Sequence, residues 1–169
     1  MSARLEIGSG SPQRCYELTV FSQDLVSLGD EWPVGRGAIR WRDGNRAELL
    51  HFAPGRWLVP DPDAALVTRL NELGPARASV VDVSGKWHVL HLSAEHAWRA
   101  LHAQISVERI LSDRGCAALA LFDCPCLLAA RSGSFDVWTH ASYVACLRQA
   151  LEHAHQRFAD CAASRGPLR

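Results

Sequence analysis

Two stretches in the second half of the chain are apolar on both faces of the strands that they would form, which constrains the fold more than any other feature. In CAALALF (116–122) and CLLAAR (126–131), residues of both parities are apolar, and successive side chains of a strand point to opposite faces. A sheet that contains such strands must be covered on both sides. We therefore expect helices on one face and the N-terminal third of the chain on the other.

The rest of the chain alternates strand-sized and helix-sized patterns. Short or alternating apolar runs predict further strands at 15–21, 37–41, 47–52, 57–59, 79–84, 88–93 and 135–138. Apolar residues at helical spacing predict helices at 62–73, 94–104 and about 142–158. Asp43-Gly44 indicates a hairpin, and Gly74-Pro75 ends the first helix. This order predicts an α+β fold of split strand–helix–strand (ferredoxin-like) units: a mostly antiparallel sheet with helices on one face, an extra hairpin and a C-terminal helix.

The two ends of the chain differ in composition from its middle. We expect an N-terminal arm and hairpin region at 1–45, a principal domain at 46–158 and a polar tail at 159–169. The first 14 residues are rich in glycine, serine and proline, which predicts a loose arm. The last helix is expected to bury Tyr143, Leu147, Leu151, Ala154 and Phe158.

Composition excludes several classes of protein. Eighteen Lys and Arg balance eighteen Asp and Glu, so no strong field attracts nucleic acid or an anionic membrane. No apolar run approaches the roughly 20 residues that span a bilayer, and the N-terminal residues lack a secretory signal pattern. Six cysteines without such a signal indicate reduced thiols. The sequence thus predicts a soluble cytoplasmic domain that binds neither nucleic acid nor membrane.

The stretch FDCPCLL (122–128) raises the question of a metal or redox site. Structural zinc needs four converging ligands, and Cys124 and Cys126 have no second ligand pair at suitable spacing. A redox pair has two intervening residues and opens a helix, whereas here Pro125 alone intervenes, between strand patterns. Pro125 also favours an extended Cys124. We interpret the stretch as a turn between strands, with thiol redox or metal chemistry at these cysteines as a further hypothesis.

No set of side chains matches a known catalytic or metal-binding pattern. His88 and His91 would point to opposite faces of a strand, and the sequence has no nucleophile elbow or phosphate-binding loop. We predict no catalytic residue and no metal ligand. Asp82 interrupts the apolar run VVDVS and, with Ser84, is a candidate for binding a small polar ligand. The alternative is that backbone N–H groups of the following turn satisfy Asp82.

Six tryptophans are many for 169 residues. Four lie in or beside predicted elements and are expected to fill the core or its rim: Trp57, Trp87, Trp98 and Trp138. Trp32 and Trp41 lie in the less regular N-terminal third, and exposed tryptophans often anchor an interface. We predict that Trp32 and Trp41 contribute to a partner interface, with local packing as the alternative.

Three stretches between residues 47 and 152 contain a recognisable order of motifs: APGRWLVP, VVDVSGKWHVLHLSAEHAWRALHAQ and CAALALFDCPCLLAARSGSFDVWTHASYVACLRQAL. The residues at the motif positions are Gly55, Trp57, Leu58, Asp82, Ser84, Leu90, Leu92, Ser93, Cys116, Phe135 and Asp136. This order of motifs resembles the gamma subunit of heterotetrameric sarcosine oxidase. Gly85-Lys86-Trp87 departs from the family's usual turn, which bears His or Arg.

The resemblance implies a fold related to the folate-binding domain of aminomethyltransferases of the glycine-cleavage T-protein type. It implies a non-catalytic accessory subunit of a flavoprotein complex that demethylates N-methyl amino acids and passes the one-carbon unit to tetrahydrofolate. The implied partners are alpha and beta subunits, which would hold FAD, FMN, NAD and tetrahydrofolate, while this chain alone holds no cofactor. The alternative function is a free-standing folate-like binding module.

Overall fold

Two five-stranded antiparallel sheets make up most of the molecule. The computed structural model describes residues 6–21, 38–40, 48–93, 97, 100–101, 104–105, 115–131 and 133–164. Sheet A has the strand order β1-β7-β10-β9-β8 and sheet B the order β3-β4-β5-β2-β6. The strands are β1 (Ile7–Gly10), β2 (Cys15–Val20), β3 (Ala38–Arg40), β4 (Glu48–Ala53), β5 (Arg56–Pro60), β6 (Ala78–Asp82), β7 (Trp87–Ser93), β8 (Cys116–Leu121), β9 (Cys124–Arg131) and β10 (Ser134–His140). The α+β class is confirmed, but the expectation of a single sheet is wrong.

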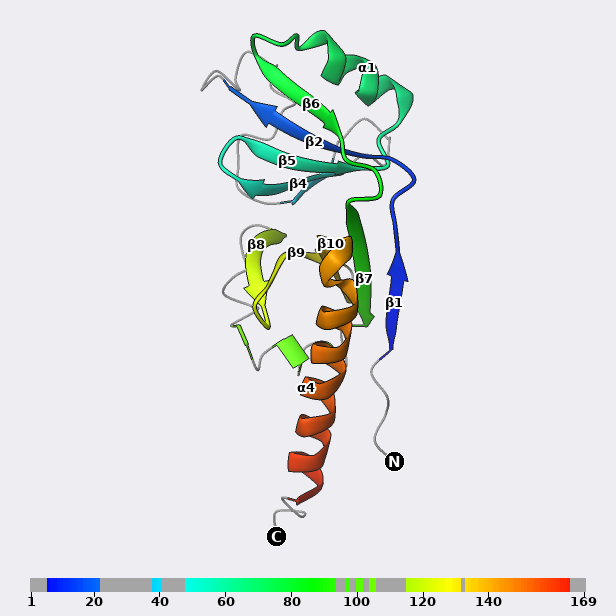
Figure 1. Ribbon diagram of the computed structural model, residues 1–169, viewed down its shortest axis with the longest axis vertical. Coiled ribbons are helices and arrows are strands. Elements are labelled where there is room, and N and C mark those ends of the chain that lie inside the picture. Colours follow the sequence, from blue (N-terminus) through cyan, green and yellow to red (C-terminus); the bar gives the residue numbers. More distant parts are fainter. Residues whose placement is uncertain are drawn as a thin grey trace.

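The molecule is layered as helix, sheet, sheet, helix, with a separate apolar core between each pair of layers. Helix α1 (Ala64–Glu72) lies on the outer face of sheet B, and helix α4 (Val144–Ser164) lies on the outer face of sheet A (Figure 1). The core between the sheets includes Leu50 and Leu58 from sheet B and Leu127 and Trp138 from sheet A. Each sheet therefore has a helix on one face and the other sheet on its second face.

The two-sided apolar strands behave differently according to their place in sheet A. In β9, Leu128 packs towards α4 and Leu127 packs towards sheet B, so the predicted double coverage is confirmed there. Strand β8 lies at the edge of the sheet, and its Ala118 and Ala120 are exposed. The expectation that β8 is covered along its whole length is wrong, because Ala118 and Ala120 lie on the same face as the buried Cys116 but are not covered by sheet B.

Two pairs of strands pass from one sheet to the other at the same place. The chain leaves β1 in sheet A and enters β2 in sheet B, while β6 in sheet B continues into β7 in sheet A. β1 pairs with β7, and β2 pairs with β6. The backbone of Cys15 holds the two crossings together, because its N–H donates to Ser84 Oγ at 3.0 Å and its carbonyl accepts from Val83 N at 2.8 Å. The expected loose arm thus contains a paired strand.

The helices agree with the sequence in position but not in every buried residue. Asp63 caps α1 by accepting from Leu66 N at 2.7 Å, and Gly74 follows the helix with a φ of +72°. Helix α4 continues to Ser164 rather than 158, into the expected polar tail. Tyr143 and Phe158, expected in the core, are 37% and 40% exposed. Neither described helix is long and apolar enough to cross a membrane.

The turn between β8 and β9 lies earlier than expected. Leu121 pairs with Cys124, so the loop consists of Phe122 and Asp123, both with left-handed φ values of 50° and 62°. This is the type I′ geometry that matches the twist of a hairpin. The two cysteines of the CPC stretch lie inside β9, and the prediction that they form the turn is wrong by two residues.

We expect Asp123→Gly to raise the free energy of unfolding by about 0.5–1 kcal/mol, because a non-glycine residue at positive φ is strained and Asp123 is exposed. The control is Glu72→Gly, at an exposed position in α1, which should lower stability by about 1 kcal/mol. Urea denaturation of both variants measures the effect. If both glycines lower stability equally, the turn is not strained at Asp123.

Candidate functional site at the junction of the two sheets

Glu17 is the most densely paired carboxylate among the described residues. It lies in β2, on the face that points to sheet A, and its side chain is 11% exposed. Oε1 accepts from Lys86 Nζ at 2.6 Å and from Trp87 Nε1 at 3.1 Å, and Oε2 accepts from Arg56 at 3.1 Å. A carboxylate from one crossing thus binds side chains from the other crossing and from β5. This arrangement compensates for the cost of burying the charge.

The donors around Glu17 also decide its protonation. Burial by itself would raise its pKa, but the hydrogen bonds from Lys86 and Trp87 and the charges of Lys86 and Arg56 outweigh burial, so the pKa lies below its ordinary value of 4.5. Glu17 is therefore ionised at neutral pH and is not a general base.

This pairing should make the junction sensitive to acid. Since the pKa of Glu17 is lower in the folded chain, its contribution to stability is full above about pH 4.5 and is lost as the pH falls through the folded pKa. Glu17→Gln should cost about 1–3 kcal/mol at pH 7, and this difference should shrink below pH 4.5. Urea denaturation at pH 7 and pH 3.5 measures both effects. The exposed Glu72→Gln is the control and should change neither.

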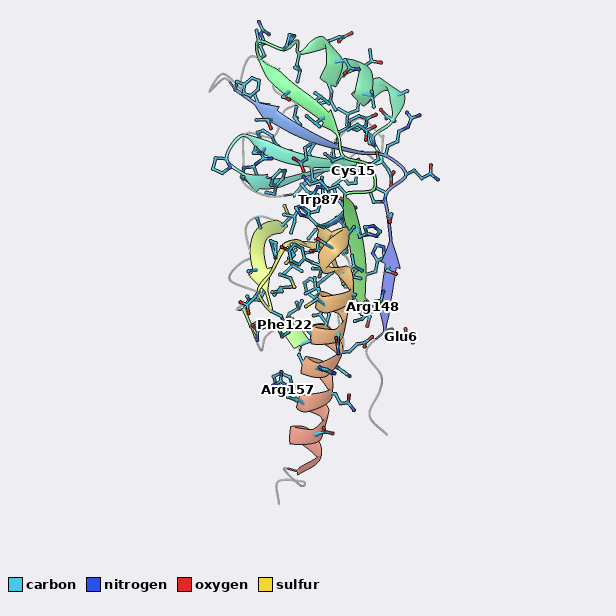
Figure 2. The ribbon with its side chains drawn as sticks, in the orientation of Figure 1. Glu6, Cys15, Trp87, Phe122, Arg148 and Arg157 are labelled. Atoms are coloured by element: carbon cyan, nitrogen blue, oxygen red, sulfur yellow. The ribbon has the colours of Figure 1, made fainter. Side chains whose placement is uncertain are left out.

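A continuous row of aromatic and cationic side chains surrounds Glu17. Arg56 lies over the ring of Phe52 at 4.9 Å, Phe52 lies 6.1 Å from Trp87, Trp87 meets His140 edge-on at 4.6 Å, and His140 lies 6.4 Å from Tyr143. Trp87 is buried and reaches the core between the sheets (Figure 2). We call the accessible members of this row, together with Lys86, the junction patch: Phe52, Arg56, Lys86, His140 and Tyr143.

The electrostatics of the patch favour a neutral His140. Burial and then the nearby charge of Lys86 lower the pKa of this imidazole below 6.5. His140 directly precedes a 3-10 helix, η2 (Ala141–Tyr143). The Lys86 carbonyl accepts from Ala141 N at 2.9 Å, so η2 is attached directly to the lysine-bearing turn.

A second polar network joins the sheets through Arg131. Its guanidinium donates to both carboxylate oxygens of Glu48 in sheet B, with 2.6 Å from Nη2 to Oε2, and its Nε donates to Asp136 Oδ2 at 2.6 Å. Asp136 Oδ1 also lies 2.7 Å from His91 Nδ1. Burial would lower the pKa of Arg131, but Glu48 and Asp136 outweigh that effect and raise it. Arg131 is therefore a permanent positive charge held by two carboxylates.

Asp82 and Ser84 are close together, but they bond to each other, and the Ser84 hydroxyl also accepts from Cys15 N. Asp82 ends β6 and is exposed, rather than lying inside an apolar strand. Hydrogen bonds from the Ser84 hydroxyl and from its backbone N–H, at 2.9 Å, lower the pKa of Asp82. The alternative derived from the sequence, that the following turn satisfies Asp82, is confirmed. Ligand binding by Asp82 and Ser84 stays a prediction.

The tryptophans predicted for the core are buried where the structure describes them. Trp57, Trp87 and Trp138 are 3%, 6% and 6% exposed. Trp98 and the two predicted interface residues, Trp32 and Trp41, lie outside the described residues. The partner interface that we predicted at Trp32 and Trp41 therefore stays a prediction.

The cysteines of β9 lie in the core between sheet A and α4. Burial raises the pKa of Cys126 to about 12, and it does the same for Cys15 and Cys116 in the core between the sheets. A thiol with such a pKa is almost entirely protonated at neutral pH and reacts slowly. In the described part of the chain, no three His, Cys, Asp or Glu side chains gather closely enough to hold a metal ion.

Alkylation of the native protein should therefore spare the three buried thiols Cys15, Cys116 and Cys126. The exposed Cys146 on α4 should react first and serves as the internal control. Pulsed labelling with iodoacetamide at pH 7.5, followed by peptide mapping, measures each site, and labelling in urea should modify all of them. Rapid labelling of Cys126 in the native protein would instead support thiol chemistry at the CPC stretch.

The chemistry of the junction is that of a fixed charge network. Glu17, Glu48 and Asp136 each accept hydrogen bonds from cationic side chains of the same chain, which hold the three carboxylates in place. Sequence reasoning missed this network. Its signal was present, because Glu17, Arg131 and Asp136 each interrupt or end an apolar strand pattern, as Asp82 does.

The fold and this site define an α+β protein of two stacked antiparallel sheets, whose polar side chains bind one another at the junction of the sheets. The chain is similar in structure to a chain of heterotetrameric sarcosine oxidase from Corynebacterium sp. U-96, solved in complex with pyrrole 2-carboxylate. The TM-score is 0.72 with 19% identity, and the match covers 91% of this chain and 85% of that chain. At this identity the likeness shows a common fold. No protein-family model and no curated protein matches the sequence.

Proposed function

We propose that this chain is a non-catalytic accessory subunit of a sarcosine-oxidase-like heterotetramer, corresponding to the gamma subunit. Alpha and beta subunits are its partners, and they hold FAD, FMN, NAD and tetrahydrofolate. The complex demethylates N-methyl amino acids, and this chain contributes by burying its surface against the larger subunits in the cytoplasm.

One observation carries the proposal: the match to the sarcosine oxidase chain extends over 91% of this chain and 85% of the other. Two chains that share a fold over nearly their whole lengths present the same layers to a partner, although fold alone does not determine function. The paired state of Glu17, Glu48 and Asp136 is a second support, because a subunit without chemistry of its own can use its buried charges for stability.

Co-expression tests the proposal. This chain, carrying a C-terminal tag, is produced with the sarcosine-oxidase-type alpha and beta subunits of its own source. We expect one complex that contains all three chains, shows flavin absorbance and oxidises sarcosine, whereas the isolated chain should be colourless and inactive. An active and fully assembled oxidase that forms equally well without this chain would contradict the proposal.

A further inference from the structure

We infer that the junction patch is the surface through which this chain docks on a larger subunit, and that it receives an acidic side chain flanked by apolar residues. This inference rests on the proposed function, since it names the place and chemistry of the contact. The patch consists of Phe52, Arg56, Lys86, His140 and Tyr143, as defined above.

Two members of the patch, Arg56 and Tyr143, are of the residue types that dominate interfaces. Tyr and Arg are enriched at binding hot spots, and here Tyr143 is 37% exposed while the side chains of Arg56 and Lys86 are 46% and 45% exposed. The Glu17 carboxylate holds both cations in place, with 3.1 Å from Oε2 to Arg56 Nη2 and 2.6 Å from Oε1 to Lys86 Nζ. Side chains that are already ordered lose less conformational entropy on binding.

The charge of the patch favours an acidic partner. Arg56 and Lys86 carry two positive charges and Glu17 carries one negative charge. His140 adds no negative charge, so positive charge is in excess at the patch. Each cation spends one of its N–H groups on Glu17, although an ammonium has three donors and a guanidinium five. The remaining donors are available to a carboxylate of the partner.

Lys86 has a further distinction, because it is the single lysine of the chain, against 17 arginines. A compact ammonium binds as a point charge, whereas a guanidinium binds as a planar fork. The ammonium and the indole N–H of the buried Trp87 bond to the same oxygen of Glu17, so the half-exposed ammonium lies where the aromatic row meets the surface. Because Lys86 is the only lysine, its ammonium is the only side-chain amine that an amine-specific reagent can modify.

The geometry of the rings favours a protein surface over a flat small molecule. Trp87 and His140 meet at an interplanar angle of 80° and Phe52 and Trp87 at 56°, with ring centroids 4.6 and 6.1 Å apart. Rings in mutual contact leave no slot between parallel faces for a planar ligand. Their outer edges are accessible instead, and such edges suit the apolar side chains that flank a carboxylate.

The first experiment measures affinity for the purified alpha–beta complex by biolayer interferometry. The test variant is Arg56→Gln with Tyr143→Ala, where Gln can still donate to Glu17. We expect its Kd to rise at least tenfold, with a melting temperature within about 3 °C of the original. The matched control is Arg157→Gln with Phe158→Ala, an exposed Arg and aromatic on α4 far from Trp87 (Figure 2), and it should bind as the original does.

The second experiment identifies the contact directly. A carbodiimide joins an amine to a carboxylate in contact with it, so treatment of the assembled complex should link Lys86 to an Asp or Glu of the larger subunit. Mass spectrometry of the peptides locates the bond. Lys86 bonded to Glu17 alone, together with unchanged affinity of the double variant, would overturn the inference while leaving the proposed function intact.

The remaining outcomes separate the two proposals. If the original chain binds no alpha–beta complex, the proposed function fails and the docking surface fails with it. If Phe21→Ser weakens assembly and the patch variant does not, the interface lies at the apolar end of sheet B, where Phe21 is 60% exposed. If sedimentation shows a dimer of this chain that the patch variant alone disrupts, the occupant is a second copy and the assignment to a larger subunit is wrong.

Discussion

Arg131→Met should lower the free energy of unfolding by about 3–5 kcal/mol at pH 7. Arg131 is the common partner of Glu48 and Asp136, whose side chains are 15% and 10% exposed. Methionine fills most of the volume but leaves two nearly buried carboxylates without their cation. The unpaired charges, rather than the lost contacts, account for most of the expected effect.

Two further variants control for changes that are not electrostatic. Arg131→Lys keeps the charge but loses the planar fork, and should cost about 1–2 kcal/mol. Arg148→Met removes a partly buried arginine whose Nη1 donates to the carbonyl of Ile7 at 3.0 Å, and should cost about 1 kcal/mol. A loss below 1 kcal/mol for Arg131→Met would mean that water reaches the two carboxylates.

Trp87→Ala should cost about 3–5 kcal/mol, which makes it the second large effect. Trp87 is 6% exposed, packs between the sheets, contacts the rings of Phe52 and His140, and donates to Glu17. Alanine would remove the indole ring that separates the charged side chains around Glu17 from the apolar core between the sheets. Thermal and urea denaturation followed by circular dichroism would measure the loss.

The contribution of the hydrogen bond to Glu17 can be separated from that of size. Trp87→Phe and Trp57→Phe remove the same atoms from two buried tryptophans, but the indole N–H of Trp57 has no hydrogen-bond partner among the described residues. We expect Trp87→Phe to cost about 1.5–3 kcal/mol more, the usual contribution of a hydrogen bond to a charged group. Equal costs would show that the bond to Glu17 contributes nothing net.

Local signals in the sequence predicted the local elements well. Asp43-Gly44 indicated the hairpin in which Ile39 pairs with Leu49, and the pattern at 62–73 contains the whole of α1 with its Asp63 cap. Two-sided apolar composition identified β9 as a covered strand. These features depend on residues close together in sequence, whose geometry their own side chains largely determine.

Non-local features escaped prediction. Strand β1 has the sequence IGSG, whose glycines and serine give no apolar alternation and so no strand signal. The division into two sheets follows from pairings such as Gly8 with His91, which no local pattern encodes. The ion pair of Glu48 with Arg131 spans 83 positions. Single charges in apolar strands indicated that partners must exist, but not which ones.

The crossing of strands between the two sheets has a consequence for the order in which the chain can fold. All strands of sheet B and helix α1 lie before residue 83, so sheet B can pair early during synthesis. Sheet A cannot be completed until β10, which ends at His140, has been synthesised, although its edge strand β1 is synthesised first. Strand β1 must remain unpaired until its partner β7 has emerged, more than 80 residues later. The glycines of β1 provide little apolar surface, which lowers the tendency of the unpaired strand to aggregate.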